Sequence, residues 1–151
     1  VLQTLRDAMD QLKLSIDSMH LPPGDITALL ANLRYRLEPR FAAMGMALQW
    51  DVDLLPVVSR LDFEAMRQLQ FMLFEALSNV LQHAKAKVLC VRAHGDAEIL
   101  IRVVDDGVGF DAHTVQSKGL ESMRERASAI GSRLHISSQP GETVVEIAFP
   151  P

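Results

Sequence analysis

Two short polar stretches carry the residue types that suit nucleotide chemistry. In the first, Glu75, Asn79 and His83 stand four residues apart, so they share one side of a helix. A carboxylate, an amide and an imidazole beside an apolar face suit a cavity better than open solvent. The second stretch, Asp105 to Phe110, follows a strand and places an acidic pair next to two glycines, where backbone can approach a ligand closely. Together the two stretches predict a nucleotide pocket.

Each part of a nucleotide has a candidate partner in these stretches. Asn79 offers a neutral oxygen that can complete an octahedral Mg²⁺ shell. Glu75 can orient or deprotonate the group that attacks the γ-phosphate, and Asp105 can accept a hydrogen bond from the adenine amino group. The phosphate tail can accept hydrogen bonds from His83 and Lys85. Gly107 and Gly109 allow the loop to close over the base. Ser117, Lys118 and Gly119 precede a helix whose N-terminal amides can face phosphate.

Each motif also has an ordinary structural interpretation. Glu75 can be a solvated helix carboxylate, and an Asp-Gly pair after a strand is often a simple turn. Arg124 and Arg126 are better explained as surface charges than as phosphate ligands. Cys90 alternates with Val88 in an apolar run, which favours a buried inert thiol.

Apolar periodicity predicts the elements that position these groups. An apolar stripe at three- and four-residue steps predicts a long helix from Phe63, capped by Asp62, to about Ala84. Alternation predicts strands, and Gly95-Asp96 predicts a hairpin between two of them. The other predicted elements are strands at 46–52, 88–93, 99–104, 133–137 and 143–149, and a helix at 120–130.

The first 45 residues favour a pair of helices. A helical apolar pattern runs from Leu2 until Leu21-Pro22-Pro23-Gly24 stops it, and Asp25 can cap a second helix that extends past Leu37. The second pattern weakens at Pro39, and Met44-Gly45 predicts the helix end.

Size and composition indicate one soluble globular unit. The 151 residues are 48% hydrophobic and 23% charged, enough to bury roughly 70% of the unfolded surface. The net charge of −4 argues against nucleic-acid binding. One cysteine excludes a disulfide framework and a thiol pair for zinc, so we expect a cytoplasmic location. No stretch approaches the roughly 20 apolar residues of a membrane span, so we expect membrane contact only through missing parts of a longer parent.

The polar motifs resemble those of the ATP-binding domain of sensor histidine kinases, in the group that includes DNA gyrase, the Hsp90 chaperone and MutL. Glu75 to His83 is similar to the N box, and Asp105 to Gly109 matches the Asp-x-Gly-x-Gly box. Gly119 to Ala127 resembles the Gly-Leu-x-x-Met-x-x-Arg segment of the subfamily with nitrate sensors and a membrane-fluidity thermosensor. The resemblance covers residues 46–150, while residues 1–45 only loosely resemble the end of a dimerisation region and its connector.

This resemblance implies a fold and a set of roles. The fold is a two-layer α/β (α+β) sandwich of the Bergerat type, with a mixed sheet of about five strands, helices on one face and an N-terminal helical extension. The implied domains are the extension at 1–45 and the ATP-binding domain at 46–151. The implied ligands are ATP and Mg²⁺, with Asn79 on the metal, Asp105 on adenine, Thr143 beside it, and Gly107, Gly109, Lys118, Gly119 and Leu120 around the lid.

The implied function is that of the catalytic domain of a two-component histidine kinase. Its partners are the dimerisation helix with the acceptor histidine, a response regulator, and a second copy in a full-length homodimer. None of the five histidines stands before an acidic residue as the acceptor does, so we expect it upstream of Val1, which is not an initiator Met. Gln82, Ser117 and Gly141-Glu142-Thr143 depart from the family pattern. A serine kinase of the anti-sigma type or an ATPase switch, and a non-catalytic module that dimerises through Leu2 to Leu37, remain alternatives.

Overall fold

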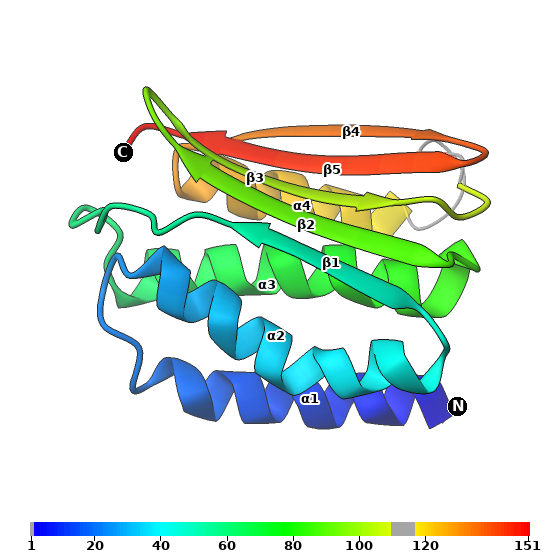
Figure 1. Cartoon of the computed structure of the whole chain (residues 1–151). Helices are drawn as coiled ribbons and strands as arrows, with labels where there is room; N and C mark the ends of the chain where they lie inside the picture. Colours follow the sequence, from blue (N-terminus) through cyan, green and yellow to red (C-terminus); the bar gives the residue numbers. More distant parts are fainter. Residues whose placement is uncertain (1, 110–116) are drawn as a thin grey trace.

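A five-stranded sheet forms one layer of the molecule, and helices cover one of its faces (Figure 1). The computed structural model describes residues 2–109 and 117–151, apart from five side chains, those of Gln3, His83, Ala84, Ser117 and Lys118. The sheet order is β1-β2-β3-β5-β4, with β1 parallel to β2 and the other neighbours antiparallel. The predicted mixed sheet is therefore confirmed. The strands are β1 Ala47–Val52, β2 Val88–Gly95, β3 Ile99–Asp105, β4 Arg133–Gln139 and β5 Glu142–Phe149.

The helices begin and end close to the predicted positions. Asp25 and Asp62 act as N-caps, because their side chains accept hydrogen bonds from Ala28 N at 3.0 Å and Ala65 N at 2.9 Å. Pro39 lies inside the second helix without ending it, and Gly45 follows the helix end with φ +71°. The helices are α1 Leu2–Ser18, α2 Ile26–Ala43, α3 Phe63–Asn79, the π-helix η1 Val80–Ala84 and α4 Ser117–Ala129.

The helical layer and the sheet share one continuous apolar core. In β3 the alternate residues Ile99, Ile101 and Val103 face this core and are at most 2% exposed. Leu69 on α3 and Leu33 on α2 are completely buried against it. Buried residues of α2 and of the sheet belong to the same core cluster, so packing does not separate residues 1–45 from residues 46–151. The predicted domain boundary between residues 45 and 46 therefore stays a prediction. Within the described residues, no helix combines the length and apolarity that crossing a bilayer requires.

Two helix ends differ from the sequence-based expectation. The helix predicted from Phe63 to about Ala84 is α-helical only to Asn79, then widens into η1 and ends with Lys85 at φ +51°. Apolar steps of three and four residues do not distinguish an α-helix from a single π turn. The helix predicted to begin at Leu120 begins at Ser117, so Ser117 and Gly119 lie in its first turn. The first amides of that turn have no partner inside the helix.

Candidate functional site

The predicted site residues gather at one end of the sheet. The start of β2 follows η1 closely, and Leu89 near that start pairs with Asp105 at the end of β3. Asp105 also pairs with Thr143 near the start of β5. The end of η1, the end of β3, the start of α4 and the β4–β5 turn therefore lie at the same end of the molecule (Figure 1). The structure brings both predicted motifs to this end.

Asp105 is a carboxylate held inside the protein. The residue is 4% exposed, and its Oδ1 accepts a hydrogen bond from Gly107 N at 2.9 Å. Burial raises the pKa of Asp105, and repulsion from Asp106 raises it further, while the Gly107 bond acts in the opposite direction. Within residues 2–109 and 117–151, no other donor reaches this carboxylate. A buried acceptor with spare capacity fits a ligand amino group, such as that of adenine.

Asp106 has a different role, which the sequence did not reveal. Its Oδ1 accepts hydrogen bonds from Lys87 N at 2.8 Å and Val88 N at 3.0 Å. These backbone bonds lower the pKa of the exposed Asp106 carboxyl. Asp106 thus ties the end of β3 to the start of β2. The two adjacent acids therefore differ: Asp105 is buried with one hydrogen bond from Gly107 N, and Asp106 is exposed and links two strands.

The glycine loop after β3 rests on the β4–β5 turn. Gly107 O accepts a hydrogen bond from Gly141 N at 2.8 Å. Gly109 has φ +77°, and a Cβ there would lie 2.9 Å from Gln139 O. Only glycine satisfies both constraints. The contact with Ser138, whose Oγ lies 2.8 Å from Thr143 Oγ1, adds a residue that the sequence analysis missed.

The predicted lid is described only at its two ends. Phe110 and the positions up to 116 lie outside the described residues, as do the side chains of His83 and Lys118. Leu120 is 1% exposed and belongs to the apolar core cluster. Its expected contact with the nucleotide stays a prediction.

The other side of the site is the end of α3. Asn79 is its last residue, is half-buried, and uses its side chain for no capping hydrogen bond. One turn earlier, the half-buried Glu75 lies directly against α4, because a Cβ on Gly119 would be 2.4 Å from Glu75 Oε1. The predicted N-box carboxylate and the predicted lid glycine are therefore neighbours. A side chain at position 119 would displace the Glu75 carboxylate from its present position.

Arg126 holds α4 against α3. Its Nη1 donates to Gln68 Oε1 at 2.7 Å, and its guanidinium lies 4.3 Å from the centre of the Phe71 ring. Arg126 is therefore half-buried between two helices rather than a free surface charge, and the expectation that it does not bind phosphate stays a prediction. Since α4 is anchored here, the position of its first turn beside Glu75 is set by helix packing.

Replacing Asp105 with asparagine tests the cost of burying its charge. Asparagine can keep the bond from Gly107 N, and the raised pKa means that the ionised carboxylate opposes folding. We expect the nucleotide-free variant to be more stable than the wild type at pH 7 in urea denaturation. The difference should shrink as the pH falls toward the ordinary value of 3.8, because the wild-type carboxyl then becomes neutral. A difference that grows at low pH would contradict this assignment, and Asp96→Asn in the exposed β2–β3 turn is the control.

Comparisons with known proteins agree with this architecture. Among solved structures, the histidine kinase domain of a blue-light-activated kinase from Erythrobacter litoralis EL346 superimposes with a TM-score of 0.72 at 21% identity, over 98% of this chain and 74% of that chain. The Acinetobacter baumannii histidine kinase AdeS gives a TM-score of 0.71 at 16% identity, over 97% of this chain and 76% of that chain. These likenesses show a shared fold.

Sequence relatives narrow the assignment. Sensor histidine kinase LiaS of Bacillus subtilis (strain 168) is 30% identical over 99% of this chain and 47% of its own length. Sensor protein VraS of Staphylococcus aureus (strain COL) is 38% identical over 83% of this chain and 40% of its own length. This chain thus spans less than half of these relatives, and the narrower subfamily stays a prediction. The family described as histidine kinase-, DNA gyrase B-, and HSP90-like ATPase matches residues 65–151. The chain therefore belongs to this ATPase family.

Proposed function

We propose that this chain is the ATP-binding catalytic part of a two-component sensor histidine kinase. The observation that carries the proposal is the buried Asp105 carboxylate, with one oxygen on Gly107 N, beside a glycine loop and at the same end of the sheet as Asn79. Membership of an ATPase family supports nucleotide binding, and the names of the relatives support histidine as the acceptor. One structural neighbour is ShkA, solved in complex with AMPPNP.

The proposed site has an adenine side and a phosphate side. Asp105 and Thr143 hold the adenine side, and the first-turn amides of α4 face the phosphate tail. No group of three His, Cys, Asp or Glu in the described part of the chain can hold a metal alone. Asn79 fits a site whose other oxygens come from phosphate and water, where Mg²⁺ would neutralise phosphate charge. In the reaction, an imidazole nitrogen of the acceptor bonds to the γ-phosphorus, the bond to the β–γ bridging oxygen breaks, and ADP leaves; Glu75 orients or deprotonates the acceptor.

The partners follow from an exposed apolar stripe on α1. Leu5, Met9 and Leu12 are each more than half exposed, and the whole stripe repeats at alternating steps of three and four residues, as in a coiled-coil seam. We infer that this stripe packs in the helical dimer of the parent protein, which carries the acceptor histidine and passes phosphate to a response-regulator aspartate. The parent is then a sensor whose catalytic part is cytoplasmic. The stripe comprises Leu2, Leu5, Met9, Leu12 and Ile16 on α1, and Met19 directly after the helix end.

Asp105→Asn tests adenine recognition. Asparagine would turn a second donor, its amide NH₂, toward the adenine amino group, because its oxygen is held by Gly107 N. We expect ATP affinity to fall at least about 100-fold in calorimetric titration. Asp96→Asn, an exposed carboxylate in the β2–β3 turn, should bind like the wild type. Unchanged affinity in Asp105→Asn would remove the central support of the proposal.

Asn79→Ala tests metal binding separately from adenine binding. In the wild type, added Mg²⁺ should raise the affinity for ATP, and chelation with EDTA should lower it again. The variant lacks the amide oxygen, so we expect similar ATP affinity with Mg²⁺ and with EDTA. If Mg²⁺ strengthens binding equally in both proteins, the metal is held elsewhere.

The chemical stability of the transferred phosphate distinguishes a histidine kinase from its alternatives. The longer protein that contains this chain should incorporate phosphate from radiolabelled Mg-ATP, and the label should be lost in acid and retained in base. Glu75→Gln should lower the rate of labelling with little change in ATP affinity. Acid-stable label would indicate a serine kinase, and ATP binding without any label would indicate an ATPase switch.

A further inference from the structure

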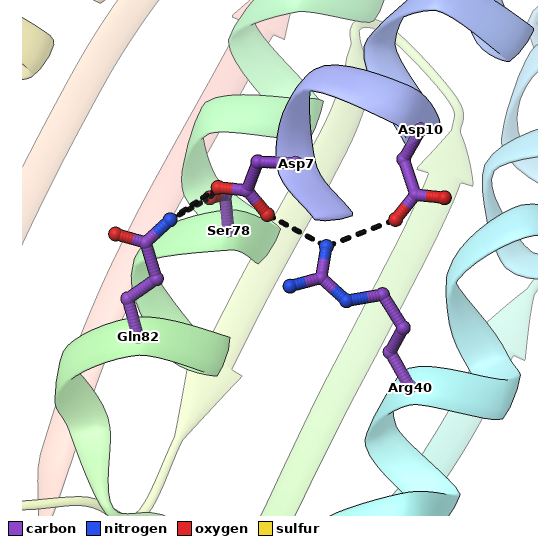
Figure 2. A network of polar contacts seen from close by, with 5 residues as sticks. All are labelled: Asp7, Asp10, Arg40, Ser78 and Gln82. Atoms are coloured by element: carbon purple, nitrogen blue, oxygen red, sulfur yellow. Dashed lines mark hydrogen bonds and ion pairs between the residues drawn. The ribbon is translucent and has the colours of Figure 1, made fainter. Parts of the chain in front are cut away.

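Five side chains form a polar cluster where α1, α2 and the N-box helix meet (Figure 2). Asp7 and Asp10 come from α1, Arg40 from α2, Ser78 from α3 and Gln82 from η1, and we call this group the Asp7 cluster. Arg40 Nη1 donates to Asp7 Oδ1 at 2.6 Å and to Asp10 Oδ2 at 2.9 Å. Ser78 Oγ and Gln82 Nε2 both donate to Asp7 Oδ2. Asp7 thus accepts hydrogen bonds from α2, α3 and η1 at the same time.

The charged members of the cluster are mostly shielded from water. The side chains of Arg40, Asp7 and Asp10 are 11%, 15% and 13% exposed. Charges at such depth are tolerated only when they are paired and hydrogen-bonded. Removal of one partner destabilises the protein, because it leaves the other charge buried without compensation. The cluster is complete only in one docked position of α1. It therefore defines the position of α1 more sharply than apolar contacts do.

Apolar packing holds α1 weakly by comparison. Among the described side chains of α1, Leu14 is the buried apolar residue, whereas α2 buries six residues. Each buried apolar side chain contributes roughly 1.5–3 kcal/mol, and polar bonds add less because water replaces them on release. Displacement of α1 is consequently a lower-cost motion than displacement of α2. The exposed apolar stripe on α1 leaves this helix open to a partner that could displace it.

The contacts of Asp7 reach residues next to the site. Ser78 directly precedes Asn79, and Gln82 lies in the π turn η1 next to His83. η1 continues into Lys85 at positive φ and then into β2, whose start pairs with the end of β3. A π turn is a local deviation from the α-helix that frequently marks functional sites. Asp7 fixes this turn from outside through the Gln82 amide.

We propose that Asp7 is a positioning residue for the nucleotide site. By holding Ser78 and Gln82, it keeps Asn79 and η1 in the arrangement that binds Mg-nucleotide, and displacement of α1 weakens that binding. This inference rests on the nucleotide-binding function proposed above. Because coupling between sites is reciprocal, a partner that seats on the apolar stripe and moves α1 lowers nucleotide affinity, and nucleotide favours the docked helix.

Asp17 supplies a matched control on the same helix. Its carboxylate accepts from Arg36 at 2.7 and 2.9 Å and from Asn32 at 3.1 Å, and both donors lie on α2, so these hydrogen bonds do not reach α3. We expect Asp7→Ala to weaken Mg-ATP binding about five- to tenfold in calorimetric titration, and Asp17→Ala to change it less than about twofold. Asp7→Asn should retain most of the affinity, because its oxygen can still accept from Ser78 and Gln82.

A double-mutant cycle and hydrogen exchange test whether Asp7 acts through Gln82 and η1. Gln82→Ala should weaken binding in the wild type but have little further effect in Asp7→Ala, since both remove the same contact. Without nucleotide, amides of residues 80–88 should exchange faster in Asp7→Ala than in Asp17→Ala. Additive effects, or equal exchange and equal affinity in the two variants, would overturn the proposal. Failure of the wild type to bind Mg-ATP would instead reject the proposed function, and exchange would still decide whether Asp7 positions η1.

Discussion

The burial of the Asp105 carboxylate at the end of β3 is the constraint on which the rest of the site depends. A charge placed there opposes folding, so the surrounding structure must supply compensation. Gly107 supplies one hydrogen bond, and Thr143 lies opposite on β5. A ligand amino group would supply a further hydrogen bond. The Asp105 carboxylate, which is unfavourable in the empty protein, is for that reason suited to recognise such a ligand. Asp106 keeps the strand ends together while Asp105 keeps its capacity for a ligand.

Close packing between α3 and α4 is the second requirement. Gly119 allows α4 to begin against Glu75, and Arg126 fixes the far part of α4 on Phe71 and Gln68. The carboxylate that we assign to the acceptor and the amides that we assign to phosphate therefore share one surface. The present position of the Glu75 carboxylate depends on the absence of a Cβ at Gly119. The β4–β5 turn under Gly109 applies the same principle on the adenine side.

Helix α1 has two faces with different physical character. One face is apolar and exposed, with the spacing of a coiled-coil seam, and the other contacts α2 and α3 mainly through charged and polar groups. Polar docking is geometrically specific but gains little net free energy, whereas apolar association gains more and is less specific. A helix with these two faces is suited to couple the binding of a partner on its apolar face to the position of α3, which bears Asn79.

Local patterns in the sequence were sufficient for most of the fold. The strand alternation, the Asp25 and Asp62 caps and the helix end before Gly45 follow from interactions within a few residues, so periodicity and capping chemistry predict them. The two polar stretches, Glu75 to His83 and Asp105 to Phe110, were also predicted to form one pocket, and the structure brings them to the same end of the sheet. The π turn was missed because its apolar spacing is also compatible with an α-helix.

Tertiary structure alone decided how neighbouring residues divide their roles. The adjacent Asp105 and Asp106 have the same chemistry, yet strand pairing buries one and bonds the other to the start of β2. In the sequence Gln82 was only a departure from the family pattern, and the structure directs its amide to Asp7, a residue far away in the sequence. Such choices depend on contacts between distant segments, and a linear pattern carries no record of which distant group will lie opposite. The sequence by itself determined which groups are available, and packing determined which of them are buried, which bond to distant segments and which gather at one end of the sheet.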